Sequence, residues 1–518
     1  MDDLTFDLPM IVNGREVLPA DRSDNHVLKY ETGVTIRIPV MLSADLAEIQ
    51  AERAALSEQL SRLTTDELTL FLHAAGDQWM TRRAPGRKLA DSYAHRITGF
   101  SAAMIEADYE TIGHFLTQRF HTWDTIAAEF GNERIFDEWI PNQMCLVRAF
   151  PRGLVLQYLV GNLPLAGLYS LLRGIITRNI NLLKLPSRDL VTVLGMVQTI
   201  IATDPDHPIA RSLSVAYWPH ESEIGDECLA TADAVCIWGG GAAVEAVKRK
   251  VRANVPVSEF GPRWSASLVD LTACDPDEAA LRLVEDVGFY DQEACFNTQR
   301  AFVKGDLDLF RSCLRRYFEL FAERYPLGSN RDALAHRSAT LLEARYLGHD
   351  VDGGDDWAIV SLVRDLPDPA FAHPLGRTLI LSPVEDFAEA LPHLNSQMQT
   401  VSVMPSELGH RLRDQIAVAG ANRIVDLGWS RMPRQGFTHD GVFGMHPLVR
   451  LVMQERSRFE FGKYYPAPSN VAEWQKLYLQ GQKWWVDAWW MQMEAQAGEA
   501  GAGEAGAEAE AGAEAGTR

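Results

Sequence analysis

Three short motifs carry side chains suited to chemistry on a carbonyl group. Gln292-Glu293-Ala294-Cys295 holds a cysteine, whose thiolate is a strong nucleophile. Gly161-Asn162-Leu163-Pro164 offers an amide N–H that can stabilise an oxyanion, and Glu259-Phe260-Gly261-Pro262 offers a carboxylate for proton transfer. Each has a plainer interpretation by itself, because Asn162 suits a simple turn and a free cysteine is usually a small buried hydrophobe.

Two further motifs could hold a phosphorylated ligand. Lys184-Leu185-Pro186-Ser187-Arg188 ends the apolar run INLLKL, which places a cation at the end of a predicted strand. Trp238-Gly239-Gly240-Gly241 lies between a predicted strand and a predicted helix, where exposed backbone N–H groups and the helix dipole favour an anion. A solvated lysine and a plain loop are the alternatives, since neither G-x-G-x-x-G nor a P-loop is present.

The elements that must position these motifs follow from the pattern of apolar residues. Residues 1–140 begin with short strands and turns and are then mostly helical. Two blocks, 141–255 and 256–450, alternate continuous apolar strands with helices, which predicts parallel sheets covered on both faces. Residues 451–496 form an aromatic, helical segment, and residues 497–518, almost only Ala, Gly and Glu, predict a disordered tail.

The aromatic segment has two open interpretations. Trp474, Tyr478, Trp485 and Trp489 would share one face of a helix. This face could dock on the protein's own core, or it could bind a partner protein.

Composition narrows the class of protein. The 518 residues carry a formal net charge of −21, which argues against a general nucleic-acid binder. The six cysteines form no C-x-x-C pair and the acidic run 349–356 lacks the final glutamate of a calcium loop, so we expect neither a disulfide framework nor a metal. Neither a signal peptide nor a membrane span is apparent, and we expect a cytoplasmic protein.

Taken together, the motifs occur in an order that resembles the aldehyde dehydrogenase superfamily. Within it, the phrases GNLPLAGLYSLLRGIITRNINLLKLPSRD, WGGGAAVEAVKRK, VSEFGPRWSASLVD, DQEACFNTQRAFV and GFTHDG are similar to the LuxC-type acyl-CoA reductases, a branch of fatty acid reductases. The resemblance covers about 140–450. It implies an α/β fold of two doubly wound parallel-sheet domains around a central cleft, with a helical N-terminal region.

The resemblance also implies roles for single residues. Residues 141–255 would bind a nicotinamide cofactor through Lys184, Ser187, Arg188, Gly239, Gly240 and Gly241, and residues 256–450 would carry the nucleophile. Cys295 would form a thioacyl-enzyme, Asn162 would hold the oxyanion, and Glu259 would act in proton transfer. Ser187 stands where NAD-preferring relatives often have an acidic residue, which predicts NADPH over NADH.

The expected activity is therefore NADPH-dependent reduction of an acyl-CoA, or of an acyl-protein thioester, to the aldehyde. Two alternatives stay open: an NAD(P)-dependent aldehyde dehydrogenase running in the oxidising direction, and a partner-fed subunit that accepts an acyl group on Cys295. An acyl-protein synthetase or an acyl carrier is the expected partner, and the superfamily implies a homo-oligomer.

Overall fold

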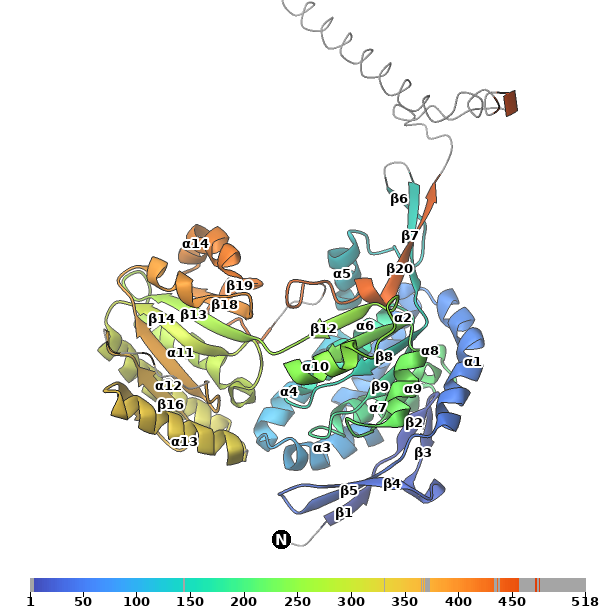
Figure 1. Cartoon of the computed structure of the whole chain (residues 1–518), viewed down its shortest axis with the longest axis horizontal. Coiled ribbons are helices and arrows are strands. Elements are labelled where there is room, and N and C mark those ends of the chain that lie inside the picture. Colours follow the sequence, from blue (N-terminus) through green and yellow to red (C-terminus); the bar gives the residue numbers. More distant parts are fainter. Residues whose placement is uncertain are drawn as a thin grey trace, which may run out of the picture. The chain divides into compact units, whose positions relative to one another are not determined.

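A computed structural model describes residues 4–455, apart from 143, 144, 330, 365, 367, 369–372, 433–435 and 437, together with residues 471, 472 and 475. Within these residues the chain forms two seven-stranded sheets and two three-stranded sheets (Figure 1). One compact unit holds residues 1–136 and 150–450, and a second holds residues 137–149 and those from 451 onward.

The first large sheet has the order β12-β11-β8-β9-β10-β2-β3. Its strands are β12 (Val257–Phe260), β11 (Ala234–Trp238), β8 (Leu154–Tyr158), β9 (Ile180–Lys184), β10 (Leu213–Ala216), β2 (Met10–Val12) and β3 (Arg15–Val17). The first five are parallel, and β2 and β3 add an antiparallel edge. The strand order reverses between β8 and β11, which is where open α/β sheets bind ligands.

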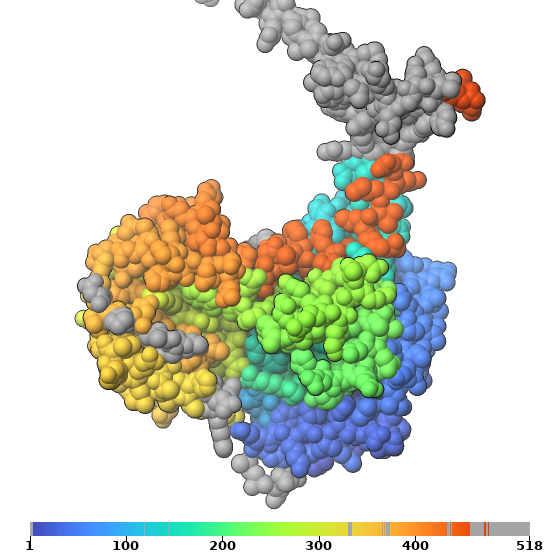
Figure 2. Space-filling view, viewed as in Figure 1, coloured from blue at the N-terminus to red at the C-terminus, as the bar shows by residue number. Residues whose placement is uncertain are grey.

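Helices connect the parallel strands of this sheet. They are α6 (Pro164–Ile176), α7 (Thr192–Thr203), α8 (Pro208–Arg211), α9 (Glu223–Thr231) and α10 (Gly241–Lys248). The strands β8 to β11 are almost fully buried, which explains their continuous apolar sequences. Helix α10, in the light green part of Figure 2, lies at the surface.

The second large sheet has the order β15-β16-β17-β14-β13-β18-β19 and is parallel except for β15. Its strands are β13 (Trp264–Asp270), β14 (Thr298–Lys304), β15 (Asp350–Gly353), β16 (Ala358–Ser361), β17 (Thr378–Pro383), β18 (Met398–Met404) and β19 (Arg423–Asp426). Its helices are α11 (Pro276–Gly288), α12 (Leu307–Arg324), α13 (Arg331–Tyr346) and α14 (Ser406–Ala419), with 3₁₀ turns η2 (Phe289–Gln292), η3 (Phe387–Glu389) and η4 (Leu391–His393).

The N-terminal region packs on the first large sheet. Its helices are α1 (Ser43–Arg62), α2 (Thr65–Met80), α3 (Pro85–Ile97), α4 (Ala102–Thr117) and α5 (Arg119–Phe130). Before them come η1 (Pro19–Asp21) and a small sheet of β1 (Leu4–Asp7), β5 (Val34–Pro39) and β4 (Asn25–Lys29). Helices α2 and α3 contact α7, and α1 contacts α8 and α9. The N-terminal region therefore belongs to the same compact unit as both large sheets.

The remaining sheet corrects one prediction. Strand β20 (Val449–Glu455), which follows the turn η5 (His446–Leu448), joins β7 (Cys145–Pro151) and β6 (Ile140–Asn142). Residues 451–455 are thus a strand, although a helical segment was expected from 451, because Val449–Glu455 pairs with β7 at the edge of the three-stranded sheet. The predicted tail 497–518 and nearly all of the aromatic segment lie outside the described residues, and so does the predicted boundary between them at residue 496. No helix among the described residues is long and apolar enough to cross a membrane.

Candidate active site

Cys295 follows a short stretch of unusual backbone between α11 and β14. Tyr290, Asp291 and Gln292 have φ angles of +51°, +50° and +68°. The left-handed conformation costs a non-glycine residue about 1–2 kcal/mol, so three in succession need strong support from their surroundings. We call residues 290–295 the nucleophile loop.

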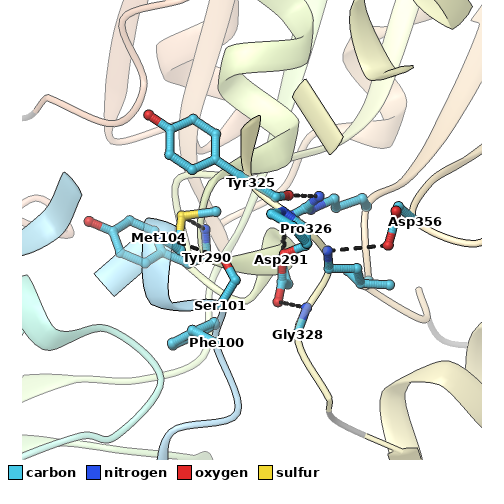
Figure 3. Close-up of polar contacts among 12 residues, drawn as sticks. Phe100, Ser101, Met104, Tyr290, Asp291, Tyr325, Pro326, Gly328 and Asp356 are labelled. Atoms are coloured by element: carbon cyan, nitrogen blue, oxygen red, sulfur yellow. Dashed lines mark hydrogen bonds and ion pairs between the residues drawn. The ribbon is translucent and has the colours of Figure 1, made fainter. Parts of the chain in front are cut away.

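A buried ion pair supports the centre of the nucleophile loop. The Asp291 carboxylate accepts hydrogen bonds from Arg377 at 2.7 Å and from the Gly328 N–H at 3.0 Å (Figure 3). Arg377 is fully buried, and it also donates to the carbonyl oxygen of Tyr325 at 2.6 Å. Burial raises the pKa of Asp291, and the guanidinium opposes that shift. The ion pair therefore stabilises a charge that would otherwise be costly at this depth.

The residues on either side of Asp291 are also held. The Gln292 amide donates to the carbonyls of Thr298 and Thr378 at 2.7 and 2.9 Å, and accepts from the Thr378 N–H at 2.8 Å. The Tyr290 hydroxyl donates to the carboxylate of Asp108, which lies on α4 in the N-terminal region. Burial raises the pKa of Asp108 to about 6. Hydrogen bonds thus hold both neighbours of Asp291 in the unfavourable conformation.

A cavity of about 290 Å³ opens on the Cys295 side chain, and we call it the thiol cavity. Three of the other residues predicted for the site also line it: Asn162, Gly239 and Gly240. Its other lining residues are Val160, Leu163, Ala166, Trp238, Phe260, Gly261, Pro262, Arg263, Gln292, Glu293, Ala294, Gln299, Leu375, His439 and Asp440. The structure therefore brings Cys295 and Asn162 together, from loops of different sheets.

Asn162 is oriented by the main chain of the nucleophile loop. Its Nδ2 donates to the Glu293 carbonyl at 2.9 Å, which leaves its second N–H for another acceptor in the thiol cavity. The Glu293 carboxylate pairs with Arg188, with Nη2 and Oε1 separated by 2.9 Å. Both contacts tie the loops after β8 and β9 to the segment that carries Cys295.

The Cys295 sulfur is buried, and one side-chain amide lies close to it. Burial raises the pKa of the thiol to about 12, and the nearby Asp440 carboxylate adds to that shift. The Gln399 Nε2 lies 3.0 Å from the sulfur. Sequence reasoning did not single out Gln399, since a glutamine within strand β18 has no motif around it. His439 and Asp440 belong to the phrase GFTHDG, which indicated the family but predicted no role for either residue.

Glu259 does not line the thiol cavity. It lies on β12, and its carboxylate forms an ion pair of 2.7 Å with Lys248 on α10. Its side chain is 49% exposed. The structure therefore does not bring this predicted acid–base residue together with Cys295 and Asn162.

A second cavity, of about 260 Å³, lies at the carboxyl ends of β8, β9 and β11, and we call it the strand-end cavity. Lys184 lines it, and burial lowers the pKa of this lysine to about 8. Trp238 lines both cavities, so they adjoin at this side chain. Beside it, a Cβ added to Gly240 or Gly241, at the start of α10, would meet nothing within 4 Å. A half-buried cation and an open helix start fit the phosphates of a dinucleotide.

Ser187 and Arg188 do not line the strand-end cavity. Ser187 is exposed, and its carbonyl accepts a hydrogen bond from the Tyr30 hydroxyl at 2.5 Å. The Arg188 guanidinium donates to the Thr98 carbonyl at 2.9 Å as well as pairing with Glu293. This placement differs from the cofactor-binding position expected for Arg188, because Glu293 offers the guanidinium a bidentate partner.

The fold is that of the aldehyde dehydrogenases. The structure matches an NADP-dependent glyceraldehyde-3-phosphate dehydrogenase from Bacillus halodurans with a TM-score of 0.69 at 15% identity, over 87% of this chain and 99% of the other. It matches aldehyde dehydrogenase 21 from Physcomitrella patens with a TM-score of 0.69 at 13% identity, over 88% and 99%. The predicted fold class is thereby confirmed.

The chain belongs to the LuxC family of acyl-CoA reductases, whose family model matches residues 60–452. It is 32% identical to the long-chain acyl-protein thioester reductase of Aliivibrio fischeri, over 87% of this chain and 93% of that relative. It is equally similar to the reductase of the same name from Vibrio harveyi, with the same identity and coverage. The branch inferred from the motifs is confirmed.

Proposed function

We propose that this protein reduces an acyl thioester to the aldehyde through an acyl group carried on Cys295. The observation that carries the proposal is the thiol cavity, in which Cys295 faces Asn162 and which adjoins the strand-end cavity at Trp238. The similarity to long-chain acyl-protein thioester reductases supports a thioester as the substrate class.

The residues of the thiol cavity suit the formation of an acyl-enzyme. The Cys295 thiolate attacks the thioester carbonyl, a C–S bond to Cys295 forms, and the carrier thiol leaves. The free N–H of Asn162 and the Cys295 backbone N–H stabilise the oxyanion in the tetrahedral state. The Asn162–Glu293 hydrogen bond keeps the amide in place beside the nucleophile.

We propose NADPH as the reductant. Lys184 and the N–H groups at Gly239, Gly240 and Gly241 would hold its phosphates, and when bound it supplies a hydride to the acyl carbon. Cys295 then leaves as a thiolate and the aldehyde is released. The Glu259 carboxylate forms an ion pair with Lys248. Oxidation of an aldehyde needs a carboxylate that activates water to hydrolyse the acyl-enzyme, so this ion pair favours thioester reduction over aldehyde oxidation.

The test is NADPH oxidation by the purified protein with acyl-CoAs of different chain length, with the aldehyde identified by mass. We expect aldehyde from the native protein, and neither aldehyde nor a covalent acyl adduct from Cys295→Ala. Acylation of Cys295 without turnover would favour the partner-fed subunit, supplied by an acyl-protein synthetase or an acyl carrier. The absence of both turnover and acylation would contradict the proposed function.

Cofactor preference provides a separate prediction. Replacing Ser187 by glutamate would place a carboxylate three residues after Lys184, where it would repel a 2′-phosphate. We expect the ratio of kcat/KM for NADPH to that for NADH to fall about tenfold, equivalent to about 1.4 kcal/mol. Ser61→Glu, on the exposed face of α1, is the matched control. An unchanged ratio in Ser187→Glu would argue against the assignment of NADPH to this loop.

A further inference from the structure

The contact between Gln399 and Cys295 is built into the second large sheet. Gln399 is 5% exposed, and its Nε2 lies 3.0 Å from the Cys295 sulfur. Ser265 on β13 fixes both partners, because its hydroxyl donates to the Cys295 carbonyl at 2.7 Å and accepts from the Thr400 N–H at 3.1 Å. Gln399 and Thr400 lie at a register shift between β13 and β18, where the Ser265 hydroxyl bridges β18 to the Cys295 main chain.

Two neighbours fix which end of the Gln399 amide faces the sulfur. The Thr400 hydroxyl donates to Gln399 Oε1 at 3.1 Å, so the oxygen is already engaged. The His439 Nε2 lies 3.5 Å from Gln399 Nε2, where an imidazole that carries its proton on Nδ1 can accept an N–H of the amide. The Asp440 carboxylate is a second acceptor beside this amide, since a hydrogen bond from Gln399 lowers its pKa. His439 is itself held edge-to-face against Trp238 and Phe260, with ring centroids 4.9 and 5.1 Å away.

The charges around His439 keep it in the accepting form. Burial and the neighbouring cations Arg173, Arg423 and Arg263 lower its pKa to about 3. Its Nε2 also lies 3.8 Å from the carboxylate of Asp440. At neutral pH the ring is therefore uncharged, and the tautomer with its proton on Nδ1 leaves Nε2 as an acceptor for Gln399.

We propose that Gln399 is a catalytic residue that donates a hydrogen bond to the Cys295 thiolate, and that His439 is a positioning residue that orients the Gln399 amide. The inference rests on the proposed function, in which this thiolate occurs twice. It attacks the substrate carbonyl in the first step. In the last step the C–S bond to Cys295 breaks, its electron pair returns to sulfur as the carbonyl C=O bond forms, and the Gln399 N–H stabilises the leaving thiolate.

A neutral donor suits this setting. Two charged groups act on the sulfur: Asp440, which raises the thiol pKa, and Arg423, which lowers it. The backbone N–H groups of Cys295 and Phe296 also favour the thiolate. Around a buried sulfur, a pre-oriented amide N–H strengthens this stabilisation without itself titrating.

The test measures the reactivity of the Cys295 thiol, which does not depend on the identity of the substrate. The full chain is alkylated with iodoacetamide at pH 8, and the rate at Cys295 is followed by mass spectrometry of its peptide. We expect Gln399→Leu to slow alkylation about ten- to a hundredfold, since a hydrogen bond to a charged group is lost. Gln399→Glu, which keeps the size of the side chain, should also react more slowly, because a carboxylate then faces the sulfur.

The matched control is Gln198→Leu. Gln198 lies on α7, and its amide donates to the Glu16 carboxylate at 2.6 Å. This variant should alkylate at the native rate. His439→Phe keeps an aromatic ring against Trp238 and Phe260 but removes the acceptor, and should slow alkylation severalfold. In turnover with acyl-CoA, Gln399→Leu should lower kcat and leave KM within about twofold.

The outcomes separate this inference from the proposed function. Native alkylation rates in Gln399→Leu would overturn the catalytic role of Gln399, even in a protein that makes aldehyde. A native rate in His439→Phe, with a slow Gln399→Leu, would overturn the positioning role of His439. Slow alkylation of both variants would support the inference even if the native protein reduced no thioester, a result that would contradict only the proposed function.

Discussion

Asn162→Ala is expected to slow aldehyde formation about 100- to 1,000-fold, the usual loss when one oxyanion donor is removed. The Asn162 amide is held beside Cys295 by its hydrogen bond of 2.9 Å to the Glu293 carbonyl. An oxyanion forms both when the thioester is attacked and when the acyl group is reduced. Single-turnover measurements should therefore show that acylation and reduction both become slower.

Controls distinguish loss of the donor from loss of structure. Asn162→Asp keeps the size of the side chain but removes its N–H groups, so it should be as slow as Asn162→Ala. Asn132→Ala removes an asparagine that accepts from the Arg134 N–H at 2.8 Å on the exposed surface, and it should turn over at the native rate. A decrease of less than about threefold in Asn162→Ala, with an unchanged thermal midpoint, would exclude Asn162 from the oxyanion site.

Arg377→Met is expected to lower the free energy of unfolding by about 3–5 kcal/mol, because it leaves the Asp291 carboxylate buried without its cation. The loss should be large here, since Asp291 is one of three successive residues with positive φ. Denaturant unfolding followed by tryptophan fluorescence measures it. Aldehyde formation should fall as well, because Cys295 is four residues from Asp291 along the same loop.

A double variant tests the physical reason. Arg377→Met combined with Asp291→Asn removes the unpaired charge and should recover part of the lost stability. Arg96→Met, on the exposed end of α3, replaces an arginine outside this network and should unfold like the native protein. A loss below 1 kcal/mol in Arg377→Met would mean that the ion pair does not support the nucleophile loop.

The residues that could be predicted from the sequence are those that carry chemistry within a recognisable local motif. Asn162 was predicted to follow a strand and Lys184 to end one, Cys295 stood in a motif of its own, and continuous apolar runs predicted the buried parallel strands. The carboxyl ends of such strands meet at one edge of a sheet, so local sequence was sufficient to predict that Asn162 and Lys184 lie at that edge, where each lines a cavity.

The residues that could not be predicted depend on contacts between distant parts of the chain. Gln399 reaches Cys295 across 104 residues, and Arg377 reaches Asp291 across 86. Neither has a local pattern, because the pairing of β13 with β18 and β14 with β17 places them. Glu259 is a different case: its motif was visible and its partner Lys248 is close in sequence, but the ion pair depends on how α10 approaches β12.

The hydrogen bond between Tyr290 and Asp108 affects how chimeras of this family should be designed. Tyr290 also donates its backbone N–H to the Met104 sulfur at 3.5 Å, and its ring lies edge-to-face with Phe100 at 6.1 Å (Figure 3). Helix α4 and the turn before it therefore pack against the first residue of the nucleophile loop. A recombinant that exchanges the catalytic block between two relatives has to exchange α4 with it, although more than 150 residues of sequence separate them. Crossovers placed only at the boundaries of the two alternating blocks would combine a nucleophile loop from one parent with the α4 helix of the other.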